Sequence, residues 1–212
     1  MAKVVPTVLA TSPAEYDQRL KLATSLSPRV HIDICDGQFA DNPTISLAQV
    51  HFDTGLAVDL HLMVKDPASQ IESALSLHPE LIIFHAESNG DLASLINHCH
   101  ELDVKAGVAI LPETTVDSAA ELIKLADHVL IFTGHLGHNG GQFQAGPLEK
   151  IAAVRQLNPS VEVGVDGGVT DVVAKQIVAK DADVLFVGAY LQSSPMPEQA
   201  YDVIQMKAEV PV

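Results

Sequence analysis

The stretch Arg29-Val30-His31-Ile32-Asp33-Ile34-Cys35 decides the fold class of this chain. Polar and apolar side chains alternate along it, as in a β-strand whose two faces meet different surroundings. A turn and an amphipathic stretch follow, and the same succession recurs. Short runs that predict strands lie at residues 4–10, 29–35, 57–64, 81–86, 105–111, 128–133, 160–166 and 183–189.

The stretches between these runs have helical patterns. Ser12-Pro13 and Asp66-Pro67 each place a capping residue before a proline, which is typical of a helix start. Predicted helices cover residues 13–26, 46–53, 67–77, 90–102, 115–126, 147–157, 171–180 and 197–208. Eight strand–helix pairs, with no dinucleotide-type glycine pattern after the first strand, favour a closed (β/α)8 TIM barrel over a doubly wound open sheet. We expect a single barrel domain over residues 1–212.

Composition excludes several classes of function. The 212 residues are 47% hydrophobic and 18% charged, which suits a large buried core, and the formal net charge is −15. A surface this acidic repels phosphate backbones and anionic lipids. We therefore expect neither a nucleic-acid nor a membrane partner. Two cysteines, Cys35 and Cys99, and a beginning unlike a secretory signal fit a protein of the reducing cytoplasm.

Ionisable residues interrupt the apolar strands where a barrel enzyme places its active site. The second predicted strand ends in His31-Ile32-Asp33-Ile34-Cys35-Asp36 and the third in Asp59-Leu60-His61-Leu62-Met63. The fourth ends in His85-Ala86-Glu87 and the seventh in Val165-Asp166-Gly167-Gly168. If these side chains point inward, His31, Asp33, His61 and Asp166 converge at the barrel mouth. Taken singly, each is more often a hydrogen-bonded core or rim residue. Since no Lys or Arg stands at these ends, a divalent cation is the economical partner for the set.

Glycine-bearing turns follow the last three predicted strands. They are Gly134–Phe143, Gly167-Gly168 and Gly188-Ala189. Loops after the late strands of a barrel often bind phosphate through backbone N–H groups, and glycine lets the backbone approach the anion closely. We therefore expect a phosphate site here. His135 and His138 are candidates for a further phosphate contact, whereas His51, His78, His98, His100 and His128 are expected to be solvated on helices or turns.

Over nearly its whole length the sequence resembles the ribulose-phosphate 3-epimerase family. The motifs that carry the resemblance are Pro6-Thr7-Val8-Leu9, residues 31–39 with Asn42 and Thr44, His61-Leu62-Met63, His85 with Glu87, Pro112-Glu113-Thr114, Gly140-Gly141-Gln142-Phe143 and Asp166-Gly167-Gly168. The chain departs from the family at Cys35, where methionine is usual, and at residues 136–139 before the glycine pair.

The resemblance implies metal-dependent epimerisation at C3 of a ketose phosphate, D-ribulose 5-phosphate to D-xylulose 5-phosphate, through a metal-stabilised enediolate. His31, Asp33, His61 and Asp166 would bind the metal, with zinc as the first candidate and Fe²⁺, Mn²⁺ or Co²⁺ as others. Asp33 and Asp166 would be the acid/base pair. The substrate would contact Thr7, His61, Met63, Gly140, Gly141, Gln142, Gly167, Gly168, Gly188 and Ala189. The resemblance also implies a homo-oligomer, a dimer or higher.

Three other interpretations remain open at this stage. The motifs do not distinguish a pentose phosphate from a six-carbon ketose phosphate such as allulose 6-phosphate. The altered loop alone supports a non-catalytic sugar-phosphate-binding barrel. A decarboxylase or aldolase of the same barrel group is weakly supported, because Cys35 stands where those enzymes have lysine.

Overall fold

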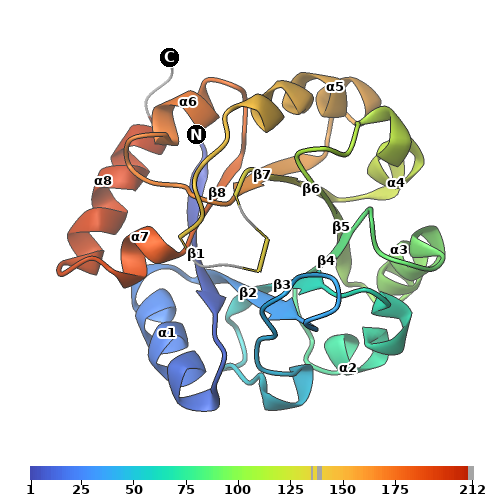
Figure 1. Cartoon of the computed structure of the whole chain (residues 1–212), viewed down its shortest axis with the longest axis horizontal. Coiled ribbons are helices and arrows are strands. Elements are labelled where there is room, and N and C mark those ends of the chain that lie inside the picture. Colours follow the sequence, from blue (N-terminus) through green and yellow to red (C-terminus); the bar gives the residue numbers. More distant parts are fainter. Residues whose placement is uncertain (135, 138–139, 210–212) are drawn as a thin grey trace.

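A closed barrel of eight parallel strands forms the centre of the molecule, with consecutive strands as neighbours and β8 paired to β1 (Figure 1). The computed structural model describes residues 1–134, 136–137 and 140–209, so the predicted contacts of His135 and His138 fall outside the described residues. The strands are β1 Lys3–Leu9, β2 Arg29–Cys35, β3 Ala57–Met63, β4 Leu81–His85, β5 Lys105–Ile110, β6 His128–Phe132, β7 Glu162–Asp166 and β8 Val184–Val187. The (β/α)8 prediction is confirmed.

Helices surround the barrel, and several are shorter than predicted. They are α1 Pro13–Leu26, α2 Ile71–Leu75, α3 Leu92–Glu101, α4 Ala120–Leu125, α5 Lys150–Leu157, α6 Ala174–Val178, α7 Ala189–Gln192 and α8 Pro197–Glu209, with 3₁₀ turns at Leu47–Gln49, Pro67–Ser69, Asp117–Ala119 and Gly146–Glu149. The helix predicted at residues 46–53 is wrong: one 3₁₀ turn buries Leu47, and Val50 is already extended. Helix α7 was missed because β8 ends at Val187, two residues before the predicted strand end. No helix in the described part of the chain has the length and apolar character needed to cross a membrane.

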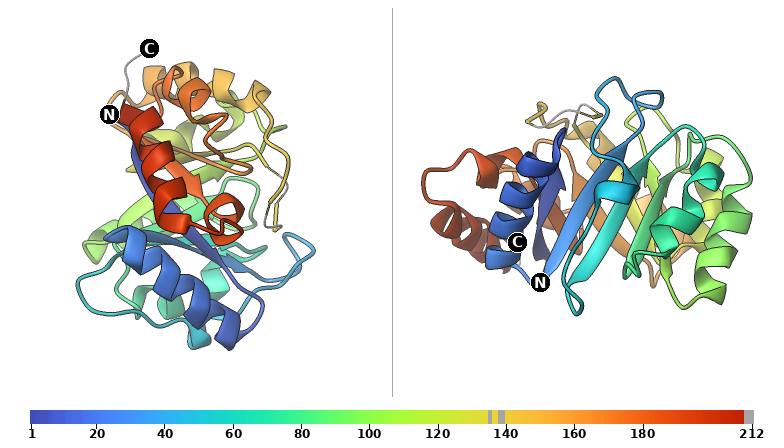
Figure 2. Two further views of the ribbon diagram at one scale, coloured as in Figure 1. Left: turned by 90° about the vertical axis from the view of Figure 1, so that its left-hand side faces the viewer. Right: turned by 90° about the horizontal axis from the view of Figure 1, so that it is seen from below.

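Strand alternation divides the interior into two apolar layers. On β2, Ile32 and Ile34 pack outward against the helices in the larger core, while His31 and Asp33 lie on the opposite face. Inside the barrel, a second cluster includes Leu130 and Phe186. The right-hand view of Figure 2 shows the loops after β2 and β6 rising from the same rim. The polar strand residues are therefore displayed at this rim on a rigid scaffold.

A charged network fills the opposite, N-terminal end of the barrel. Arg29 donates through Nε to both carboxylate oxygens of Asp59, at 3.1 and 2.9 Å, and through Nη1 and Nη2 to Glu162, at 3.0 and 2.8 Å. His128 donates from Nδ1 to Glu162 Oε2 at 2.9 Å. Asp59 points inward as expected but belongs to this end rather than to the mouth. The prediction of a solvated His128 is wrong, because the residue begins β6 and is 1% exposed.

Glu162 should make the stability of the fold sensitive to acid. Burial by itself raises the pKa of Glu162, but hydrogen bonds from His128 and Arg29 outweigh burial and hold it well below its ordinary value of 4.5. Such a carboxyl contributes stability that is complete above its ordinary pKa and is lost as the pH falls below it. We expect the free energy of urea unfolding of the wild type to decline below about pH 4.5, and that of Glu162→Gln to decline less steeply. Parallel declines would contradict this role.

Candidate active site

Four side chains from three strands meet at the mouth of the barrel. His31 and Asp33 come from β2, His61 from β3 and Asp166 from the end of β7, and one ligand atom of each lies within 4.8 Å of the others. Strand register explains why two of these residues are close, because Asp33 is the pairing partner of His61 in the ladder between β2 and β3. Closure of the barrel places β7, and with it Asp166, near the residues of β2 and β3. All four predicted metal ligands are therefore brought together.

The cluster has the ligand atoms that a divalent cation requires, and some of these atoms lack a hydrogen-bond partner among the residues that the structure describes. Asp33 Oδ1 lies 2.9 Å from His61 Nδ1 and 3.3 Å from His31 Nε2. Neither ring nitrogen of His31 forms a hydrogen bond within the described residues, although the ring is fully buried. A buried imidazole without a partner is costly. Two imidazoles and two carboxylates form a ligand set that suits zinc and related ions, so the residues fit such a cation.

The two aspartates have pKa values displaced in opposite directions. Burial raises the pKa of Asp33, but the adjacent imidazoles of His31 and His61 outweigh it and lower the pKa well below the ordinary range. Burial and the nearby charge of Asp33 raise the pKa of Asp166 to about 6. Asp166 is therefore the more basic carboxyl. Paired carboxyls with separated pKa values are typical of acid/base sites.

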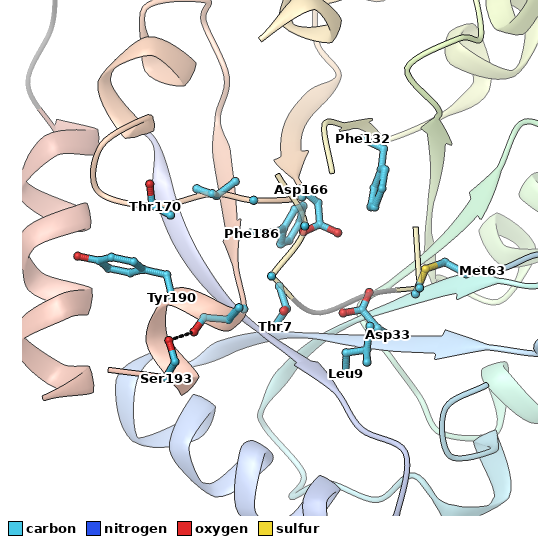
Figure 3. A pocket seen from close by; sticks show the side chains of 18 residues that line it. Thr7, Leu9, Asp33, Met63, Phe132, Asp166, Thr170, Phe186, Tyr190 and Ser193 are labelled. Atoms are coloured by element: carbon cyan, nitrogen blue, oxygen red, sulfur yellow. Dashed lines mark hydrogen bonds between the residues drawn. The ribbon is translucent and has the colours of Figure 1, made fainter. Parts of the chain in front are cut away.

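A cavity of about 280 Å³ opens directly above this pair. Figure 3 shows the carboxylates of Asp33 and Asp166 pointing into it from different strands, with Met63 close to Asp33. Thr7 also lines the wall, as expected. His31 and His61 do not line the cavity, because both are fully buried behind Asp33. The expected substrate contact of His61 is therefore indirect in this geometry.

Glycine turns line part of the same cavity. The expected contributors are present: Gly140, Gly141, Gly167, Gly168, Gly188 and Ala189. A Cβ at Gly167 would lie 2.2 Å from the backbone nitrogen of Gly134, and one at Gly168 would lie 2.6 Å from the carbonyl oxygen of Gly141. Only glycine permits this approach of the two loops, and both residues have positive φ. Gln142 is exposed and lies outside the residues lining this cavity.

Sequence reasoning missed several residues of the cavity wall. These are Leu9, Phe132, Gly137, Val169, Thr170, Phe186, Tyr190 and Ser193. Strand alternation contained a signal for Leu9, which is two residues after Thr7 on β1 and so shares its inward face. Tyr190 and Ser193 had no such signal, because α7 was not predicted. None of the lining residues in the described part of the chain carries a positive charge.

Comparisons with known proteins agree with this geometry. A family model described as "Ribulose-phosphate 3 epimerase family" matches residues 3–192. The ribulose-phosphate 3-epimerase of Chlamydia pneumoniae is 31% identical over 180 residues, covering 81% of this chain and 79% of that protein. The ribulose-phosphate 3-epimerase of Treponema pallidum is 30% identical over 194 residues, covering 88% and 89%.

A more distant solved structure shares the fold alone. The 3-keto-L-gulonate-6-phosphate decarboxylase of Vibrio cholerae superposes with a TM-score of 0.74 at 13% identity, covering 98% of this chain and 97% of that one. Sequence motifs, site geometry and the match over nearly the full length lead to one assignment. The chain belongs to the ribulose-phosphate 3-epimerase family and, with it, to the isomerases.

Proposed function

We propose that this protein interconverts D-ribulose 5-phosphate and D-xylulose 5-phosphate by inverting C3. The observation that carries the proposal is the pair Asp33 and Asp166, which face one cavity that is also lined by glycine turns and lie beside two buried histidines. Inversion next to a ketone needs proton removal on one face of the carbon and proton return on the other. Two carboxyls from different strands are suited to that task.

In the proposed reaction the two aspartates exchange roles with direction. One carboxylate removes the proton from C3, and the electron pair left behind forms an enediolate with the neighbouring carbonyl. The other carboxyl, which holds a proton, delivers it to the opposite face of C3 and becomes ionised. In the cluster without a cation, the pKa values of Asp33 and Asp166 shift in opposite directions, which supports such a pair.

His31, Asp33, His61 and Asp166 would hold a divalent cation, and we propose zinc. When bound, it would act as a Lewis acid that stabilises negative charge developing on the substrate oxygens. Met63 lines the cavity, and Cys35, which does not line it, packs in the same apolar cluster as Met63, so the two sulfurs provide polarisable packing. Cys35 is 3% exposed, and its Sγ lies 3.3 Å from the carbonyl oxygen of Ala40.

The glycine turns would bind the phosphate group. Gly140, Gly141, Gly167, Gly168 and Gly188 place backbone against the cavity. Because the described lining residues carry no Lys or Arg, the donors available to the anion are backbone N–H groups and hydroxyls such as that of Thr170. Such a site accommodates a phosphate in a protein of net charge −15 without a surface basic patch.

Solvent deuterium wash-in tests the function directly. We expect the purified protein to incorporate deuterium at C3 of ribulose 5-phosphate and to produce xylulose 5-phosphate, with much slower exchange of allulose 6-phosphate. Faster exchange of allulose 6-phosphate would reassign the substrate to a six-carbon ketose phosphate. Absence of exchange with both sugars, in protein supplied with zinc, iron(II), manganese(II) and cobalt(II) in turn, would exclude the enzyme and leave a binding barrel.

A further inference from the structure

A chain of hydrogen bonds extends from the metal cluster to a carboxylate that no proposed step uses. His61 Nε2 lies 2.8 Å from His85 Nε2, and His85 Nδ1 lies 3.3 Å from Glu87 Oε2. The other oxygen of Glu87 accepts from the backbone N–H of Leu111 at 3.0 Å. Both histidine rings are fully buried, with centroids 4.9 Å apart. The chain thus leads from the end of β4 into the site.

The far end of this chain is firmly anchored. Leu111 follows β5, and Lys150 Nζ donates to the carbonyl oxygens of Leu111, Pro112 and Thr114, at 2.6, 2.8 and 2.7 Å. The side chain of Thr114 also hydrogen-bonds Glu87. Glu87 is therefore held by donors on a loop that Lys150 fixes, so its second oxygen is directed toward His85.

The anchored carboxylate determines where each proton of the chain lies. An ionised carboxylate only accepts, so His85 must carry its proton on Nδ1 and donate it to Glu87. The neutral ring then has a lone pair on Nε2, which accepts the proton on His61 Nε2. With a cation bound, Asp33 would ligate it rather than accept a hydrogen bond from His61. This leaves the lone pair of His61 on Nδ1, the nitrogen that lies 2.9 Å from Asp33 Oδ1 inside the metal cluster.

We propose that Glu87 and His85 are positioning residues that hold His61 in the tautomer whose Nδ1 can bind the cation. This inference rests on the proposed metal site. Partners of a metal-bound histidine orient its ring and increase its basicity, and their loss typically weakens metal binding by about 10–100-fold. Sequence similarity had marked His85 and Glu87 without a role.

Glu87→Gln is the decisive variant because it keeps the size of the side chain and reverses the direction of its hydrogen bond with His85. The amide oxygen is retained by the Leu111 N–H, so the NH₂ group faces His85 Nδ1 and makes it an acceptor. The His85 proton then moves to Nε2, and the His61 proton moves to Nδ1, where the cation would bind. Glu113→Gln is the matched control, because Glu113 is exposed on the same loop and loses the same charge.

The test is the zinc dissociation constant, measured by chelator competition. We expect Glu87→Gln to weaken zinc binding by about 10–100-fold, with Glu113→Gln unchanged. His85→Leu should lose as much as Glu87→Gln, whereas His85→Gln, whose amide oxygen can replace Nε2 as acceptor, should recover most of the affinity. Thermal unfolding of the chelator-treated variants verifies that each folds. In the zinc-loaded wild type, histidine ¹⁵N NMR should show His85 protonated on Nδ1.

The outcomes separate this inference from the proposed function. Wild-type zinc affinity in Glu87→Gln and His85→Leu, or a His85 ring protonated on Nε2 in the zinc-loaded protein, overturns the positioning role and leaves the epimerase proposal in place. A wild-type protein that binds no divalent ion overturns both the metal site and the positioning role.

Discussion

Asp166→Asn is expected to lose epimerase turnover by at least about 10²–10⁴-fold, the range that general acid–base groups typically contribute. The amide can neither accept the C3 proton nor deliver one. Asp166 is partly exposed and borders the cavity, so an isosteric amide should not disturb packing. Asp33→Asn should lose turnover to a similar extent. Rates are measured by coupled assay and by deuterium incorporation at C3.

The two variants should differ in which epimer still exchanges with solvent. Each retains one carboxyl, so each should exchange only the epimer whose C3 proton faces that carboxyl, without producing the other epimer. Asp41→Asn is the control, because Asp41 is exposed at the rim and lines a separate cavity beside the mouth. Full turnover in either active-site variant, or exchange of both epimers by one variant, would remove that aspartate from the mechanism.

Arg29→Met should destabilise the protein by about 3–5 kcal/mol, the usual cost of removing one partner from a buried ion pair. Arg29 joins Asp59 of β3 to Glu162 of β7 across the base of the barrel. The side chain of Asp59 is 1% exposed, and burial raises its pKa to about 6 even with Arg29 adjacent. Without the guanidinium, the buried carboxyl of Asp59 and the part-buried carboxyl of Glu162 lose their shared partner. Urea unfolding at pH 7 measures the loss.

Lys105→Met is the matched control at the same end of the barrel. Lys105 Nζ and Glu80 Oε1 are 2.8 Å apart, but their side chains are 59% and 49% exposed. Solvent screens such a pair, so its removal should cost no more than about 1 kcal/mol. Equal losses from the two substitutions would show that Arg29 acts as an ordinary surface charge and not as the centre of a buried network.

Local sequence patterns predicted those features of this protein that depend on short segments, such as the strands and the faces of their side chains. Period-two alternation on β2 correctly placed His31 and Asp33 on the inner face, and the recurring runs predicted the eight-stranded barrel. The same rules failed where a neighbour in space determines the result. His128 was expected to be solvated, yet it is buried in β6 against Glu162, a residue 34 positions later. The helix predicted at residues 46–53 is absent because the chain forms one 3₁₀ turn that buries Leu47 and then runs extended at Val50, which is buried as well.

The sequence by itself determined which side chains face the barrel interior and which strand ends carry ionisable groups, because the direction of a side chain on a strand depends only on its neighbours in the chain. Only the tertiary structure decided which of these groups meet. Barrel closure brings Asp166 to Asp33, joins Arg29 to Glu162 across 133 positions, and aligns His61 with His85 and Glu87. These meetings depend on strand register and barrel closure, which arise from the packing of the whole chain and from no single segment.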